Sequence, residues 1–197
     1  MYGTYDYNRP YIGYPPPPMP DIAFEPVPVM PPVYPDGIIP DPVEVADCPP
    51  IDWVPATHQT AYSLMDRAFV AGKEGWDNSP LWAIRVHHDA GLIPGKLAVT
   101  HGAAYIPLAG KEVPVQEFEI LCTDPSLVQW VSTSRDEIPE NAIPAGNTHI
   151  GEPLYIGRVK HRGSLTPGKV HTSHKCCYIS FGGSEISYKR YEILCEV

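Results

Sequence analysis

The stretch "PLYIGRVKHRGSLTPGKVHTSHKCCYISFGGSEISYKRYEILC", residues 153–195, decides the fold because a second version of it occurs earlier in the chain. Residues 80–122 read "PLWAIRVHHDAGLIPGKLAVTHGAAYIPLAGKEVPVQEFEILC", and the two align without a gap at an offset of 73 residues. Eighteen of the 43 positions are identical, against roughly three expected by chance at ordinary composition. The chain therefore contains an internal repeat, which indicates a fold built from two similar units.

The two copies differ in length near their beginnings. Trp53 and Trp130 open the copies but lie 77 residues apart, so the first copy carries four extra residues before Pro80. We expect a first β repeat over residues 53–122 and a second over residues 130–197. Because one copy alone is small for a hydrophobic core, we expect the two to pack as one unit.

The shared segments predict β-strands. In "FEILC" (118–122) the side chains alternate, so Phe118, Ile120 and Cys122 face one side of a strand. Gly182-Gly183 suits a turn with positive φ, and "TAYSLMDRAFVAG" (60–72) is the one candidate helix in the two copies. The pattern predicts an all-β fold, with two tandem repeats forming one compact domain with pseudo-twofold symmetry.

The N-terminal segment has a different composition. Residues 1–50 hold fifteen of the 25 prolines and six of the twelve tyrosines, and proline excludes helix and central strand. We expect an extended, disordered tail. It is either a solubilising tail or a ligand for WW-like modules, because "PPVY", Pro31–Tyr34, has the spacing of a WW-domain ligand.

Charge and targeting signals limit the partners and the location. The net charge of −9 makes nucleic acid a poor partner. The sequence contains neither a secretory signal nor a run of eighteen apolar residues, so we expect no membrane span. The five cysteines do not resemble a secreted disulfide framework. A cytoplasmic location is expected, and secretion by an unconventional route stays open.

A cluster in the second copy resembles a reactive centre, with His171, His174, Cys176 and Cys177 within seven residues. Residues along a strand alternate between faces, so these side chains do not converge on a metal without a bend. The first copy has alanine at the positions of His171 and both cysteines. We therefore expect neither a metal nor another cofactor, and small buried roles for the cysteines. With no catalytic motif, the sequence indicates a protein that is not an enzyme.

Three polar pairs recur in both copies. Each lysine follows Pro-Gly, which predicts a tight turn with the ammonium placed to bind a polar ligand. The glutamates are candidate salt-bridge partners or second acceptors, and the arginines are expected to form ion pairs within strands. The recurring residues are Lys96 and Lys169, Glu112 and Glu185, and Arg85 and Arg158.

The pattern "W…G…PLYIGR…H…G.L.PGKV..SH..CYI.FGG.E…YEILC" resembles the DM-nine repeat family over about residues 53–197. The resemblance implies a compact β-fold of two intertwined repeats that often forms a homodimer. It also implies a lectin-like protein that binds mannose-type sugars and acts in innate immune recognition. The alternative is an intracellular adaptor, whose proline-rich tail is the functional ligand.

In the sugar-binding members that this chain resembles, the lysine of Pro-Gly-Lys pairs with an aspartate 21 residues before it. That position holds Thr148 in the second copy and Gly75 in the first, and Glu152 is the carboxylate nearest to Thr148. The altered length of the first copy makes Glu74 and Asp77 the candidate substitutes. The resemblance thus implies ligand-binding roles for Lys96, Lys169, Glu74, Asp77, Thr148, Glu112 and Glu185.

Overall fold

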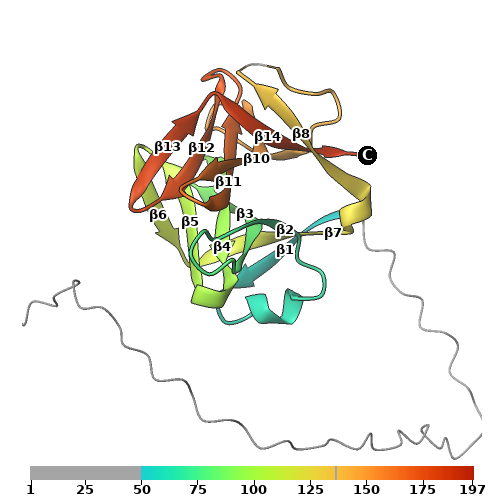
Figure 1. The fold of residues 1–197 in the computed structure, drawn as a ribbon, viewed down its shortest axis with the longest axis vertical. Coiled ribbons are helices and arrows are strands. Elements are labelled where there is room, and N and C mark those ends of the chain that lie inside the picture. Colours follow the sequence, from blue (N-terminus) through green and yellow to red (C-terminus); the bar gives the residue numbers. More distant parts are fainter. Residues whose placement is uncertain (1–49, 136) are drawn as a thin grey trace, which may run out of the picture. The chain divides into compact units, whose positions relative to one another are not determined.

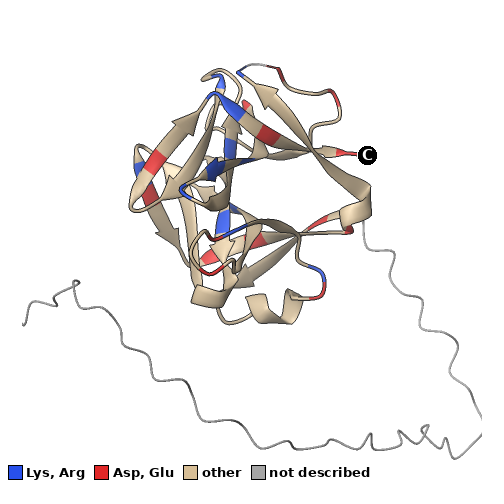
Figure 2. Ribbon diagram, in the orientation of Figure 1, with Lys and Arg blue, Asp and Glu red and all other residues tan. Residues whose placement is uncertain are grey.

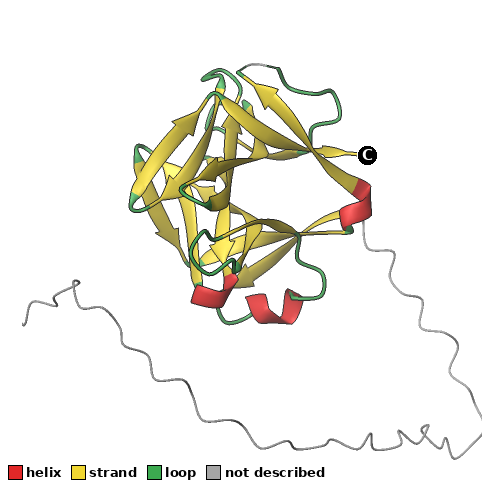
Figure 3. Ribbon diagram, viewed as in Figure 1, coloured by secondary structure: helices red, strands yellow, loops and turns green. Residues whose placement is uncertain are grey.

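The computed structural model describes residues 50–135 and 137–197, so the tail and its Pro31–Tyr34 motif lie outside the described residues. The described chain is all-β, as the sequence predicted, with 14 strands in one sheet (Figures 1 and 3). Short 3-10 helices interrupt it, namely η1 (Ala61–Leu64), η2 (Val99–His101) and η3 (Pro125–Leu127). None of the described helices has the length and apolar character needed to cross a membrane.

The strands occur in the same order in both copies. The first copy contributes β1 (Ile51–Thr57), β2 (Val70–Lys73), β3 (Pro80–His88), β4 (Gly91–Ala98), β5 (Ala103–Leu108), β6 (Lys111–Val115) and β7 (Glu117–Thr123). The second contributes β8 (Val128–Ser134), β9 (Pro144–Asn147), β10 (Pro153–His161), β11 (Ser164–His171), β12 (Cys176–Phe181), β13 (Ser184–Tyr188) and β14 (Arg190–Glu196).

The two copies exchange strands to close a barrel. The ring runs β3–β2–β11–β12–β13–β6–β5–β4 and returns to β3. Strand β2 of the first copy pairs with β11 of the second, and β9 of the second pairs with β4 of the first. Strands β6 and β13 meet at Lys111 and Ser184, which are equivalent positions of the two copies. Since the ring needs strands of both copies, the repeats are intertwined, as the fold class predicted.

The core is shared in the same way. One buried cluster combines Phe69 and Leu121 of the first copy with Ile143, Ile156 and Leu194 of the second. A second cluster belongs mainly to the first copy, yet it includes Leu154. Because a single repeat is too small to bury such a core by itself, the exchange of strands supplies the missing apolar surface.

The Pro-Gly-Lys motif is not a turn, contrary to the prediction. Both instances lie buried inside strands β4 and β11. A Cβ atom at Gly95 would meet the carbonyl oxygen of Tyr105 at 2.3 Å, and one at Gly168 would meet that of Tyr178 at 2.0 Å. The glycine is therefore required by the close approach of the neighbouring strand, and the lysine that follows it points from a strand.

The turns lie elsewhere. The predicted turn at Gly182-Gly183 is confirmed, with φ of 58° and 84°, and it joins β12 to β13. Ala109-Gly110 forms the equivalent turn, with φ of 50° and 79°. The helix expected over residues 60–72 is wrong beyond its first turn, because η1 ends at Leu64 and the chain then enters β2.

The recurring arginines form ion pairs within the sheet, as predicted. Arg158 Nε donates to Glu192 Oε2 at 2.6 Å, and its guanidinium lies 4.1 Å from the ring centroid of Trp130. Arg85 repeats both contacts with Glu119 and Trp53. Each tryptophan that opens a copy is thus held over the ion pair of its own copy.

Candidate ligand-binding site

Lys169 and Glu185 form a buried ion pair that joins the two copies. The Lys169 ammonium donates to the carbonyl oxygen of Pro107 at 2.5 Å and lies 3.0 Å from Glu185 Oε1. Glu185 in turn accepts the backbone N–H of Gly110 at 2.7 Å. The two side chains are 8% and 9% exposed. A lysine and a glutamate of the second copy therefore hold the β5–β6 hairpin of the first.

Lys96 and Glu112 repeat this arrangement from the other side. Lys96 donates to the carbonyl oxygen of Ser180 at 2.7 Å and lies 3.2 Å from Glu112 Oε1. Glu112 accepts the backbone N–H of Gly183 at 2.7 Å. The predicted pairing of recurring lysine with recurring glutamate is therefore present in both copies.

These contacts leave each lysine part of its binding capacity. An ammonium has three donors, and the described partners of Lys169 are two oxygens, with the Tyr178 ring centroid 5.3 Å away. Basic and acidic positions are interspersed over the strands of both copies (Figure 2). The Lys169 ammonium is therefore a balanced buried charge with one donor to spare.

A pocket of about 530 Å³ opens beside Lys169. Its wall brings together three of the sequence-predicted site residues, Thr148, Lys169 and Glu185. The first copy contributes the β3–β4 and β5–β6 turns, so the pocket lies at the seam between the copies. The other lining residues are His88, Asp89, Ala90, Gly91, Ile93, Leu108, Ala109, His149, Leu154, His171, His174 and Tyr178. This volume is typical of small-molecule sites.

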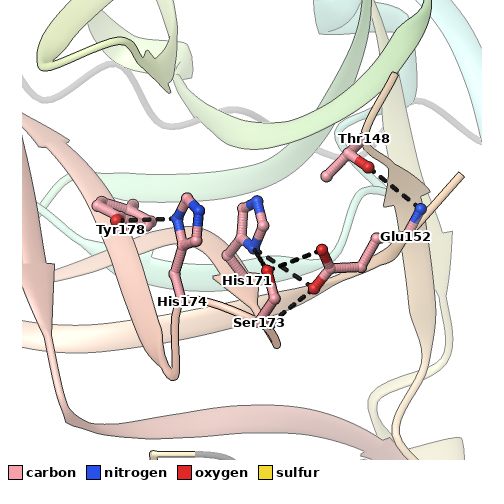
Figure 4. A network of polar contacts seen from close by, with 6 residues as sticks. All are labelled: Thr148, Glu152, His171, Ser173, His174 and Tyr178. Atoms are coloured by element: carbon pink, nitrogen blue, oxygen red, sulfur yellow. Dashed lines mark hydrogen bonds and ion pairs between the residues drawn. The ribbon is translucent and has the colours of Figure 1, made fainter. Parts of the chain in front are cut away.

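A polar network shapes one wall of the pocket (Figure 4). Glu152 accepts the backbone N–H of Ser173 at 2.6 Å and its hydroxyl at 2.9 Å. The Thr148 hydroxyl accepts the backbone N–H of Glu152 at 3.1 Å. The Ser173 backbone bond is the main reason that the pKa of Glu152 lies below its usual range. Glu152 is thus a structural carboxylate that fixes the 171–174 turn.

The imidazoles of His171 and His174 stack on this wall. Their ring centroids are 3.7 Å apart and the rings are parallel within 1°. Burial lowers the pKa of His171, and the neighbouring His174 lowers it further. The His174 Nδ1 lies 3.1 Å from the Tyr178 hydroxyl. Burial raises the pKa of Tyr178 to about 12, so this phenol stays protonated.

The first copy differs at the equivalent place. Glu74 is the counterpart of Thr148, because its N–H donates to the Ser79 carbonyl as that of Thr148 does to the Glu152 carbonyl. The half-buried Glu74 carboxylate makes no hydrogen bond or ion pair with the described residues. Asp77, the other predicted substitute, is bound to the Ser79 N–H and to His101.

The cysteines are buried, as interpreted from the sequence. Cys176 and Cys177 are 5% and 0% exposed, and burial raises the pKa of both thiols. Thiols of this kind are poor nucleophiles. Within residues 50–135 and 137–197, no three His, Cys, Asp or Glu side chains come together in a way that could hold a metal ion.

Sequence reasoning missed two features of the site. It took Glu152 only as the carboxylate nearest to Thr148, whereas Glu152 orders the turn that carries the stacked histidines. It also missed the contribution of the β3–β4 turn, because Asp89 and Ala90 are remote in sequence from Lys169. Only the 74-residue spacing of β2 and β9, which differs from 73 elsewhere, carried a signal for the Glu74 counterpart.

Comparison with known proteins places the fold and the family. The nematode sperm cell motility protein MFP2B has a similar fold, with a TM-score of 0.50 and 16% identity over 73% of this chain and 41% of that chain. Natterin-3 of Thalassophryne nattereri is 33% identical over 67 residues, which are 34% of this chain and 16% of Natterin-3. The DM9 repeat model matches residues 74–188, more than half of the chain. The intertwined β-repeats described above thus belong to a known family, and this chain is a member of the DM9 repeat family.

Proposed function

We propose that this domain is a non-enzymatic carbohydrate-binding protein of recognition type, with a mannose-type sugar held in the pocket beside Lys169. The observation that carries the proposal is the Lys169–Glu185 pair in the wall of a pocket that also presents the Thr148 hydroxyl. A role in innate immune recognition follows from the resemblance to lectin-like members of the family.

The chemistry of the pair suits a polyol. The spare ammonium donor of Lys169 donates to a sugar hydroxyl oxygen, and Glu185 has lone pairs left to accept a hydroxyl proton. The Thr148 hydroxyl supplies a neutral donor and acceptor where a second carboxylate is absent. Apolar lining residues such as Ile93, Leu108 and Leu154 pack against the C–H faces of the ring.

The equivalent lysine of the first copy marks a second, quasi-equivalent site. There Lys96 pairs with Glu112, and Glu74 occupies the place of Thr148 with its carboxylate unpartnered among the described residues. A carboxylate at this place is a stronger acceptor for vicinal hydroxyls than a threonine hydroxyl. We therefore expect two sites of unequal affinity, with Glu74 and Thr148 as the residues that differ.

The test is glycan binding by the full chain at pH 7.4, on a glycan array and by titration with mannan in competition with free mannose. Replacing Thr148→Val removes one hydroxyl and is expected to weaken binding about fivefold, the worth of roughly one hydrogen bond. Thr148→Ser keeps the hydroxyl and should retain affinity. Thr100→Val is the matched control, because Thr100 is exposed and outside the pocket.

An array without a carbohydrate ligand would refute the proposal. Equal affinities of the Thr148→Val and Thr148→Ser variants would move the sugar away from this pocket. The number of mannose equivalents bound per chain then decides between one site and two.

A further inference from the structure

The pocket beside Lys169 is unusually rich in histidine. Its lining includes His88, His149, His171 and His174, four of the eight histidines in the chain. The carboxylates near it are largely engaged. Glu185 binds Lys169 and Gly110, and Glu152 binds Ser173. The uncommitted polar atoms that face this space therefore belong mainly to imidazoles.

The stacked pair presents two such atoms side by side. The Nδ1 edge of each ring is engaged: that of His171 lies 3.5 Å from Glu152 Oε1 and 3.4 Å from Ser173 Oγ, and that of His174 faces the Tyr178 hydroxyl. The Nε2 atoms make no hydrogen bond with the described residues. Because the rings are parallel at 3.7 Å, both Nε2 edges point the same way (Figure 4).

We propose that the stacked His171–His174 pair is an oxyanion-binding subsite of this pocket, which takes the carboxylate or sulfate group of an acidic sugar once the imidazoles are protonated. This inference rests on the proposed function for the identity of the sugar ring, although the anion contact does not. Two parallel N–H donors match two oxygens of one anion, as in other bidentate charge-assisted contacts.

Protonation decides when this subsite is active. The charged groups that face the pair are Lys169, Glu185, Glu152 and Asp89, which together leave an excess of negative charge while the histidines are neutral. The other titratable groups are His88, His149, Tyr178 and Cys176, and the last two keep their protons. Protonation of the four histidines therefore reverses the sign of the local charge.

Neutral pH keeps the subsite silent. Burial holds the pKa of His171 below its ordinary value, so His171 is neutral at pH 7.4. A bound anion favours the protonated imidazole, so binding takes up protons and strengthens as the pH falls.

The first copy provides a natural reference for the pair. Ala98 stands at the place of His171, and His101, the counterpart of His174, stacks on Trp76 and bonds to Asp77. Since the fold forms there without a second histidine, His171 is not required for folding. His171→Ala thus recreates a side chain that the same backbone already accepts at residue 98.

The experiment is calorimetric titration of the full chain at pH 7.4 and pH 5.0 with mannose, mannuronate, mannose 6-sulfate and inorganic sulfate. The carboxylate and sulfate probes keep their charge over this range, so a change reports on the protein. We expect both acidic sugars to bind about tenfold more tightly at pH 5.0, the worth of roughly one charge-assisted hydrogen bond, and mannose to change little. His171→Ala should abolish the gain.

His87→Ala is the matched control, because His87 is exposed and lies outside the pocket. It should keep the full pH dependence. Inorganic sulfate separates the sources of the anion, since equal affinity for it and for mannose 6-sulfate shows that the sugar ring contributes nothing.

Two results overturn the inference: acidic probes that bind no more tightly at pH 5.0, or a gain that survives in His171→Ala. If mannose binds at pH 7.4 and the acidic probes show no gain, the proposed function stands and the subsite is wrong. If sulfate binds at pH 5.0 in a His171-dependent manner and no neutral sugar binds, the subsite stands and the proposed function is wrong.

Discussion

Replacing Lys169 with methionine is expected to destabilise the domain independently of any ligand. The substitution keeps most of the side-chain volume but removes the ammonium that bonds to the Pro107 carbonyl and to Glu185. Glu185, which is 9% exposed, is then left as a buried charge. Lys169 thus acts as a structural cross-link between the copies as well as a candidate ligand contact.

The magnitude follows from the environment of the stranded carboxylate. Removing one partner of a buried ion pair costs about 3–5 kcal/mol. Glu185 retains the backbone N–H of Gly110 at 2.7 Å, which offsets part of this penalty. We therefore expect Lys169→Met to lower the free energy of unfolding by about 3 kcal/mol, a large share of the total for a domain of this kind.

Urea denaturation at 25 °C and pH 7 measures this loss, and a double-mutant cycle isolates the pair. Glu185→Gln keeps an acceptor for Gly110 without the charge, so Lys169→Met/Glu185→Gln should be more stable than Lys169→Met alone by about 1 kcal/mol or more. Lys160→Met is the control, because Lys160 is exposed on β10, and its effect should stay within about 0.5 kcal/mol.

A loss below about 1 kcal/mol for Lys169→Met would refute the cross-link and its energetic basis. Strict additivity in the cycle would show that Lys169 and Glu185 act separately. The cycle also guards the interpretation of binding data, since a lectin assay on Lys169 variants is meaningful only for protein that remains folded.

Three further predictions concern the backbone, the histidines and the thiols. Gly168→Ala should cost about 3 kcal/mol or more in urea denaturation, since the new Cβ would meet a β12 carbonyl at 2.0 Å; Gly183→Ala, with φ of 84° and open space around it, should cost only about 1 kcal/mol, and equal losses would contradict the cause given for the buried glycine. Burial lowers the pKa of His161 and His171 in the folded state, so the unfolded chain binds protons more readily and stability should fall as the pH drops from 7.5 through 6.5 to 5.5; a flat urea midpoint over that range would argue against it. Cys177, fully buried with its pKa raised by burial, should not react with a thiol reagent until the domain unfolds, and rapid labelling of the native protein at this residue would show that the core opens locally.

Much of the architecture was accessible from sequence because it depends on patterns that repeat along the chain. Two copies of a strand-rich segment indicated a pseudo-twofold all-β domain, and the alternation in "FEILC" placed Phe118, Ile120 and Cys122 together in one buried cluster. The ion-pair role of Arg85 and Arg158 was also correct. These features depend on local periodicity and on residues that recur at one spacing.

The errors have a common physical cause. Pro-Gly is a turn signal when only neighbours in sequence are considered, but Gly95 and Gly168 are needed where the carbonyl of an adjacent strand comes too close for a Cβ. Residues 65–72 favoured a helix by composition, yet a Cβ at Gly72 would meet the Leu165 carbonyl at 1.9 Å. That strand position is set by pairing with the other copy.

The repeat, the all-β class and the identity of the recurring lysines and glutamates can be read from the chain without coordinates, because each is a matter of spacing and side-chain chemistry. The strand exchange, the pocket and its stacked histidines cannot. They depend on contacts between residues about 60 to 90 positions apart, such as Lys169 with Pro107 and Lys96 with Ser180. Such contacts form only when both copies fold together, since neither copy can close the barrel or bury its lysine alone.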